Sequence, residues 1–217
     1  EGSLLWEGKE VRFESPLDAQ RCGIAMVHQE NSLVPYLSVM DNIYLGHYPK
    51  KGMFIDKNQL REKAISLMKE LRIEAIDPDI KVVNLSVAQK QLVEIVKALS
   101  LNAKLLMLDE PTASLTTKET KYLMDIIEEL RKKGVAIVYV SHRLEEVFSI
   151  ADEISVLRDG SMIINMQKEQ FDYDQVIFHM IGRKLEDYDV AGIDQRDLQH
   201  SDEALRVEHL SRRNELT

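Results

Sequence analysis

The chain has 217 residues, of which 44% are apolar and 30% are charged. This balance is typical of a soluble globular protein with one sizeable domain, or one domain and an appendage. No apolar run approaches the ~20 residues of a membrane-spanning helix, and residues 1–30 do not resemble a signal peptide. The net charge of −9 argues against a nucleic acid as the main partner, because no basic surplus displaces counterions. A single cysteine, Cys22, excludes an internal disulfide framework and indicates a reducing cytoplasm.

The N-terminal part of the chain contains two strand patterns and one clear helical pattern. Residues 1–13 alternate around Glu7–Glu10, which predicts a β-hairpin. Ile24–Val27 predicts a short buried strand that leads into His28, Gln29 and Glu30. In the polar and helical stretch that follows, Asp56 to Gln59 resembles a capping box. The helix after it carries an apolar stripe made of Leu60, Ala64, Leu67, Met68 and Leu71.

The middle of the chain predicts two strands joined by a helix. Leu105–Leu108 is a continuous apolar run, as expected of a parallel strand covered on both faces, and Val135–Val140 predicts a second buried strand. Between them, Thr116–Glu119 can cap a helix that Gly134 ends. The helices before and after the first strand have the apolar stripes Leu92, Ile95, Val96, Leu99 and Leu123, Ile126, Ile127, Leu130. This order predicts an α/β fold with a parallel sheet and right-handed crossovers.

The C-terminal part predicts a second hairpin, a helix and a linker. Glu153–Leu157 and Met162–Met166 form the two strand patterns, with a turn at Asp159-Gly160 between them. A helix is predicted near Tyr173–Ile181. Residues 185–203 are polar and acidic, which suggests a linker, and residues 204–210 alternate like the opening strand of a further domain.

Three predicted strands end in polar side chains that suit phosphate chemistry. In open α/β sheets ligands bind beyond the carboxyl ends of the strands, where Gln29, the pair Asp109 and Glu110, and His142 are found. Each has an ordinary explanation on its own, as a loop residue, a helix cap or a structural hydrogen-bonding histidine. Their joint presence at successive strand ends is less easily explained in that way.

The four side chains have complementary roles in nucleotide hydrolysis. Asp109 can hold a Mg²⁺ ion that bridges the terminal phosphates. Glu110 can orient and deprotonate the attacking water. Gln29 offers an amide oxygen to Mg²⁺ or to that water, and His142 can donate to the γ-phosphate.

The segment Ser86-Val87-Ala88-Gln89 allows two interpretations. It is a capping box with Ser86 as the N-cap and Gln89 at the third helical position. The same helix end also has free N–H groups that can bind an anion. Geometry alone favours phosphate binding only slightly, through the small side chains at Val87 and Ala88.

Taken together, these motifs resemble the ATP-binding subunits of ABC transporters over residues 1–183. The matching segments, in order, are the Q-loop Val27–Glu30, the signature Leu85–Gln89, the Walker B strand Leu105–Pro111, the D-loop Thr112–Leu115 and the H-loop Val140–Arg143. The resemblance implies a P-loop NTPase fold of ABC type, with a RecA-like core and a helical subdomain at about residues 33–100. It also implies that Ser86, Val87, Ala88, Gln89 and Ser114 contact an ATP molecule that is held by a partner domain.

Finer details are similar to the monosaccharide-import branch, whose subunits have two nucleotide-binding domains in one chain. The segments 23–29, 38–42, 46–49, 52–56 and 137–143 resemble galactose/methylgalactoside-type subunits, with ribose-type subunits as the near alternative. Residues 1–184 are then expected to be a first nucleotide-binding domain, and residues 204–217 the opening strand of a second. Two departures are Val87-Ala88 in place of two glycines and Thr116 where aspartate is common.

A larger departure from the family pattern is the missing Walker A loop: none of the nine glycines belongs to a Gly-x-x-x-x-Gly-Lys-Ser/Thr segment. The nearest candidate, Gly2 to Gly8-Lys9, has five intervening residues and is followed by Glu10 rather than Ser or Thr. In this family the loop lies upstream of the hairpin, so we expect it to precede Glu1, which makes the domain N-terminally incomplete. We expect Mg-ATP binding by these residues alone to be very weak.

The resemblance implies an ATPase that drives sugar import, with ATP and Mg²⁺ as cofactors. Its expected partners are an integral-membrane sugar permease, a second nucleotide-binding domain and, indirectly, a sugar-binding protein. The expected location is the cytoplasm, peripheral on the inner face of the cell membrane. The alternative is a non-catalytic docking or regulatory module that does not bind ATP. A further alternative, an ABC ATPase acting on DNA or the ribosome, is disfavoured by the acidic charge and the short helical insertion.

Overall fold

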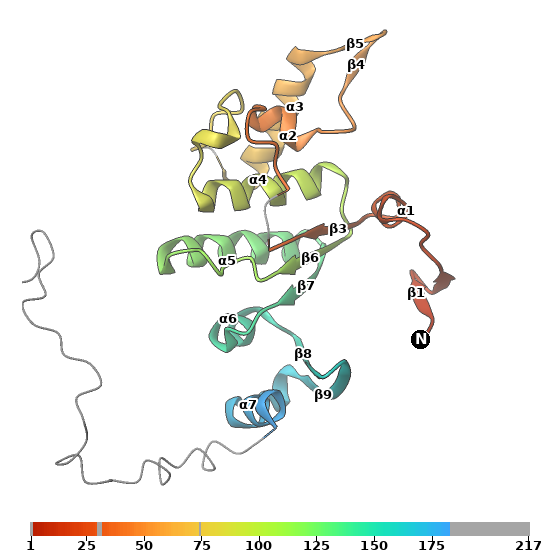
Figure 1. The fold of residues 1–217 in the computed structure, drawn as a ribbon, viewed down its shortest axis with the longest axis vertical. Helices are drawn as coiled ribbons and strands as arrows, with labels where there is room; N and C mark the ends of the chain where they lie inside the picture. The colour runs from red at the N-terminus through yellow and green to blue at the C-terminus, as the bar shows by residue number, and fades with distance from the viewer. Residues whose placement is uncertain (1, 30–31, 74, 183–217) are drawn as a thin grey trace, which may run out of the picture. The chain divides into compact units, whose positions relative to one another are not determined.

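The computed structural model describes residues 2–29, 32–73 and 75–182 (Figure 1). The described residues fall into two compact units, one up to Asp152 and the other from Glu153 onward. Glu30 of the expected Q-loop, the expected linker 185–203 and the strand predicted from residue 204 lie outside the described residues. Across the described ranges, the helices are too short or too polar to cross a bilayer.

The centre of the first unit is a three-stranded parallel sheet. It contains β3 (Ile24–Val27), β6 (Leu105–Asp109) and β7 (Ala136–Val140) in the order β3-β6-β7. The helix α5 (Thr117–Lys132) connects β6 to β7, so the predicted βαβ unit is confirmed. The register places Met26 beside Met107 and Met107 beside Val138.

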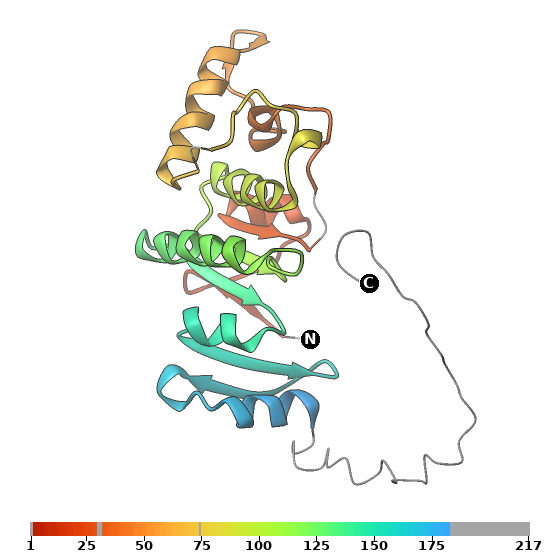
Figure 2. The same cartoon turned by 90° about the vertical axis from the view of Figure 1, so that its left-hand side faces the viewer.

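One face of this sheet is covered by helices. The buried strand residues are Ala25, Val27, Leu106 and Leu108, and the last two are fully buried. Figure 2 shows α4 (Val87–Ser100) and α5 as neighbouring helices beside the sheet. The predicted stripe of α5 is buried throughout, and that of α4 is buried except for the partly buried Leu99.

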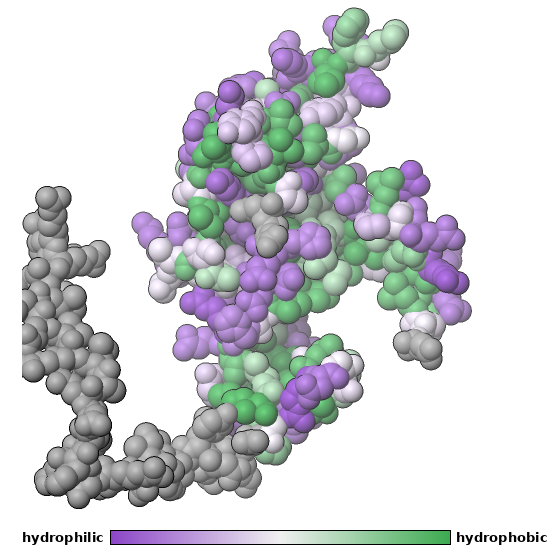
Figure 3. Space-filling view, in the orientation of Figure 1, coloured by the Kyte–Doolittle hydropathy of each residue, from purple (hydrophilic) through white to green (hydrophobic). Residues whose placement is uncertain are grey.

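The opposite face of the sheet is open. The residues between the buried ones alternate toward solvent, and Met26, Val138 and Val140 are 44%, 40% and 50% exposed. Figure 3 shows apolar surface in the region of β6 and β7. The prediction of strands buried on both faces is therefore wrong for alternate residues of β3 and β6, because helices among the described residues cover one face only. It is wrong for the whole of β7, whose residues are all exposed or only half-buried.

Residues 39–84 form small helices and one short hairpin. The elements are α2 (Val39–Ile43), the strands β4 (Lys50–Lys51) and β5 (Phe54–Ile55), α3 (Lys57–Glu70) and a 3-10 turn at Val82–Asn84. Asn42 is fully buried on α2, and its side chain accepts from the Val34 N–H at 2.7 Å and donates to the Val34 and Ser38 carbonyls. These bonds fix the loop before α2.

The predicted capping boxes have different outcomes. At α5 both reciprocal bonds between Thr116 and Glu119 are present, as predicted. At α3 the Asp56 carboxylate accepts from the Gln59 N–H, but the return bond is missing because the Asp56 N–H donates to the Pro49 carbonyl at 2.9 Å. The box predicted there is therefore only half formed.

The remaining elements of the first unit come before β3 and after β7 in the chain. The predicted N-terminal hairpin is confirmed, with β1 (Leu4–Trp6) paired to β2 (Lys9–Val11). It is followed by α1 (Pro16–Arg21), which the sequence patterns did not predict. After β7 comes α6 (Leu144–Ile150), whose N-cap residue is Arg143.

The second unit confirms the predicted hairpin and helix. The antiparallel strands β8 (Glu153–Arg158) and β9 (Ser161–Gln167) are joined at Asp159 and Gly160, whose φ angles of 52° and 76° suit a tight hairpin turn. After a 3-10 turn at Lys168–Gln170, α7 (Tyr173–Ile181) packs on β8. The buried residues are Ile154, Val156, Met166 and Val176.

Candidate active site

The carboxyl ends of β3, β6 and β7 lie at one edge of the parallel sheet. Gln29 follows β3, Asp109 is the last residue of β6, and His142 follows β7. Asp109 is in register with Val140 at the end of the neighbouring strand. The topology therefore brings the three predicted strand ends to the same side of the sheet, as expected from their sequence positions.

Glu110 and His142 contact each other directly. The His142 Nδ1 and the Glu110 Oε1 are 2.9 Å apart, and the two side chains are 66% and 27% exposed. Because an ionised carboxylate only accepts hydrogen bonds, Nδ1 carries the proton in this pair. The other ring nitrogen of His142 is then available for a second group. The sequence placed both residues in one site but did not predict this hydrogen bond.

Glu110 has a backbone conformation that is unusual for a residue with a side chain. Its φ is +44°, in the left-handed region, which costs on the order of 1–2 kcal/mol for a non-glycine residue. The Glu110 N–H donates to the Val140 carbonyl at 2.9 Å, and the Ala113 N–H donates to the Glu110 carbonyl at 3.2 Å. These bonds hold the carboxylate at the tight turn that follows β6.

Asp109 and Gln29 have side-chain oxygens that could bind a metal ion. Neither side chain forms a hydrogen bond with another described residue. Asp109 is half-buried and Gln29 is exposed. Within the described ranges, His, Cys, Asp and Glu form no group of three or more that could hold a metal ion. A carboxylate with an amide oxygen suits Mg²⁺, which usually takes one or two protein ligands and completes its shell with phosphate and water. The donor set fits such an ion.

The structure forms the capping box at Ser86. The Ser86 Oγ accepts from the Gln89 N–H at 3.2 Å, and the Ser86 N–H donates to the Gln89 Oε1 at 2.9 Å. The hydroxyl proton of Ser86 is still able to donate, and the first-turn N–H groups of Val87 and Ala88 have no acceptor within the helix. Ser86 and Val87 are exposed. The cap and an anion site are therefore compatible at this helix end.

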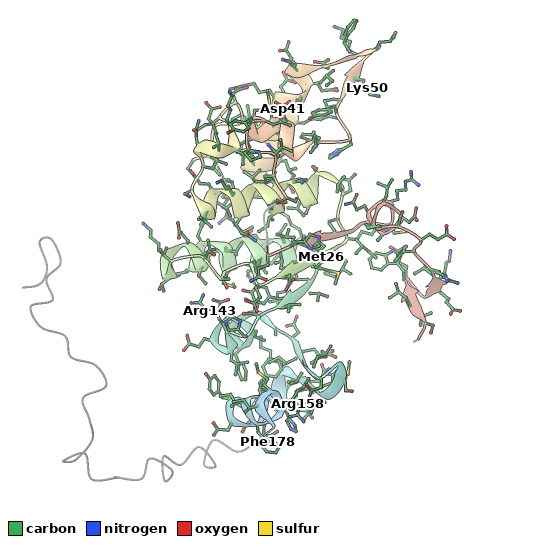
Figure 4. All side chains as sticks on the ribbon, in the orientation of Figure 1. Met26, Asp41, Lys50, Arg143, Arg158 and Phe178 are labelled. Atoms are coloured by element: carbon green, nitrogen blue, oxygen red, sulfur yellow. The ribbon has the colours of Figure 1, made fainter. Side chains whose placement is uncertain are left out.

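The D-loop has one exposed and one buried polar side chain. Ser114 is exposed, and Thr112 is 1% exposed. The Thr112 Oγ1 donates to the Glu146 Oε2 at 2.6 Å, and so does the Tyr139 hydroxyl at 2.7 Å. Arg143, which Figure 4 shows beside α6, donates to the Glu146 Oε1 at 2.6 Å.

Sequence reasoning missed this buried cluster. Arg143, the N-cap residue of α6, and Glu146 have opposite charges three residues apart, a spacing that predicts an ion pair. The participation of Thr112 and Tyr139 depends on the pairing of β6 with β7, and no local pattern indicates it.

Comparison with known proteins identifies a family. The pattern of the ABC transporter family matches residues 1–113. The galactose/methyl galactoside import ATP-binding protein MglA of Salmonella typhimurium is 49% identical over 184 residues, which cover 85% of this chain and 36% of that protein. The chain thus spans about a third of the length of the curated relatives it matches.

Solved structures have the same fold. A nucleotide-free ATP-binding cassette from an ABC transporter superposes with a TM-score of 0.71 at 25% identity, covering 84% of this chain and 78% of that chain. The ADP conformation of another such cassette gives a TM-score of 0.69 at 26% identity, with the same coverage. The resemblance and the α/β P-loop NTPase fold expected from the sequence are confirmed, and the chain belongs to the ABC transporter family.

Proposed function

We propose that this chain forms part of an ATP-hydrolysing subunit that energises the import of a monosaccharide, of the galactose or methyl galactoside class. The observation that carries the proposal is the 2.9 Å pair of Glu110 and His142 beside Asp109, at the edge of the sheet. The name of the Salmonella typhimurium relative supports the substrate class.

The proposed chemistry assigns one task to each side chain. Glu110 orients the attacking water and accepts its proton. His142 is held by Glu110 through Nδ1, and in its doubly protonated form it donates from the other ring nitrogen to the γ-phosphate. Asp109 and Gln29 would hold Mg²⁺, whose charge stabilises the phosphate oxygens.

The helix end at Ser86 is proposed to serve a second nucleotide-binding domain. Ser86, Val87, Ala88 and Gln89, together with Ser114, would contact the ATP that this second domain holds. Such an arrangement uses the free first-turn donors of α4 for an anion. The other proposed partners are a membrane permease and, through it, a sugar-binding protein. The proposed location is the cytoplasmic face of the membrane.

Reconstitution tests this function. We expect the natural full-length protein, assembled with its permease in proteoliposomes and supplied with its sugar-binding protein, to release phosphate from ATP only with Mg²⁺ and to drive galactose uptake. Chelation of Mg²⁺ is the control, and a panel of pentoses and hexoses tests the substrate. Phosphate release with uptake of another sugar would correct the substrate alone. No phosphate release under any of these conditions would contradict the proposal.

Substitutions of Ser86 separate its capping role from its proposed role toward phosphate. Aspartate and asparagine both cap helices as well as serine does, so both variants should keep the stability of α4. We expect Ser86→Asp to lower ATP hydrolysis by the full-length protein at least about tenfold, because a carboxylate at a helix end built for an anion repels phosphate. Ser86→Asn should lose much less.

Ser86→Asp and Ser86→Asn differ mainly in the charge of the side chain, so a difference in their hydrolysis rates reports on repulsion of phosphate. The thermal unfolding midpoint of each variant and its rate of phosphate release are measured on the same preparations. Equal hydrolysis by the aspartate and asparagine variants would restrict Ser86 to capping.

A further inference from the structure

A buried carboxylate is hydrogen-bonded to the two loops that carry Glu110 and His142. Glu146, on α6, is 9% exposed, and its two oxygens accept three close hydrogen bonds. Oε2 accepts from the hydroxyls of Thr112 and Tyr139, and Oε1 accepts from the Arg143 guanidinium. A buried charge is costly unless it is paired and hydrogen-bonded, and this carboxylate is both.

The donors around Glu146 come from different parts of the chain. Thr112 belongs to the loop after β6, Tyr139 to β7, and Arg143 to the start of α6. Arg143 also reaches the Thr112 carbonyl at 3.5 Å. A tyrosine hydroxyl is protonated at neutral pH, and burial together with the bond to Glu146 raises the pKa of Tyr139 further above its ordinary value, so this group is a hydrogen-bond donor. One carboxylate thus joins the loop after β6 to the loop after β7.

These two loops carry the proposed catalytic pair. Thr112 is separated from Glu110 only by Pro111, whose ring restricts the backbone, and Arg143 directly follows His142. Fixing Thr112 and Arg143 on one carboxylate therefore limits how far Glu110 and His142 can move apart.

The backbone strain at Glu110 gives a second reason for such a clamp. A residue with φ of +44° keeps that conformation only where its surroundings over-determine it. The Glu110 N–H and carbonyl bonds fix one side of the turn. The Thr112 hydroxyl bond to Glu146 fixes the other side.

From this geometry we infer that Glu146 is a positioning residue for ATP hydrolysis. It holds the loops after β6 and β7 so that the Glu110 carboxylate faces the His142 imidazole, and it touches neither water nor nucleotide itself. The inference rests on the proposed hydrolysis of ATP and assigns a role to a side chain that lies outside all of the matched motifs.

The test is steady-state ATP hydrolysis by the natural full-length protein. We expect Glu146→Gln to lower kcat by about tenfold to a hundredfold with little change in KM, since small displacements of catalytic groups cost rate on this scale. Glu145→Gln is the matched control, because Glu145 is its exposed neighbour on α6 and should retain wild-type kcat. Thr112→Val should lower kcat in the same direction, and Thr112→Ser, which restores the hydroxyl, should recover it.

A double-mutant cycle separates positioning from general destabilisation. If Glu146 acts through the catalytic pair, adding Glu146→Gln to His142→Ala should cause almost no further loss of kcat. A merely structural role would give the full loss in both backgrounds. Thermal unfolding midpoints identify any variant that does not fold. If Glu146→Gln does not fold, the kcat values of Thr112→Val and Thr112→Ser test the role of Glu146 instead.

The outcomes for the two proposals are distinct. Wild-type hydrolysis with unchanged kcat in Glu146→Gln, or with full additivity in the cycle, would overturn the role of Glu146 alone. Absence of hydrolysis by the wild type would overturn the proposed function and this inference with it.

Discussion

Replacing Glu110 by glutamine in the natural full-length protein should lower kcat for ATP hydrolysis by about 10²–10⁴-fold, the contribution of a general base. The amide cannot take a proton from water, but its oxygen can still accept from the His142 Nδ1. The site should therefore keep its shape and its ability to bind nucleotide. Phosphate release and binding of a fluorescent ATP analogue are measured on the same preparation.

The matched control for this experiment is Glu62→Gln on α3. Glu62 is exposed, and no hydrogen bond or ion pair of its side chain is found among the described residues. Its replacement should leave both hydrolysis and binding unchanged. If Glu110→Gln hydrolyses ATP at the wild-type rate, Glu110 is not the base. If it loses nucleotide binding as well, the loss of kcat cannot be attributed to proton transfer.

Much of the site could be predicted because its residues are set by local patterns. Asp109 and Glu110 follow an apolar strand and His142 follows the next one, so a parallel βαβ unit must bring them to one edge. The capping box at Ser86 is equally local, since both partners lie within one helical turn. Period and spacing are sufficient for such features.

The features that could not be predicted depend on tertiary contacts. The Glu146 cluster requires Thr112, after β6, and Tyr139, on β7, to come together. The positive φ of Glu110 was not predicted either, because the residue is not a glycine and is followed by a proline. The burial of the strands was wrong for a related reason. A continuous apolar run does not reveal whether helices cover one face or two, and Val140 is 50% exposed on the face that is open here.

Among the substitutions considered, we expect the largest loss of stability from one on the covered face of the sheet. Leu106 is fully buried between β3 and β7, in register with Ala25 and Ile137. Leu106→Ala removes several methyl and methylene groups and leaves a cavity, so the free energy of unfolding should fall by about 3 kcal/mol, within the range for buried leucines. Urea unfolding of this chain, followed by circular dichroism, measures the change.

The adjacent residue on the same strand is the control for that experiment. Leu105 points to the opposite face and is only half-buried, so Leu105→Ala should cost about 1 kcal/mol or less, in proportion to the apolar area it removes from water. Both variants delete the same atoms from neighbouring positions of β6, so the difference in strand propensity between leucine and alanine cancels in the comparison. A clear difference between them would establish that only one face of the sheet is packed in this chain. Equal losses would mean that the second face is also covered in solution, and Met26 and Val138, which are exposed here, would then be buried as well.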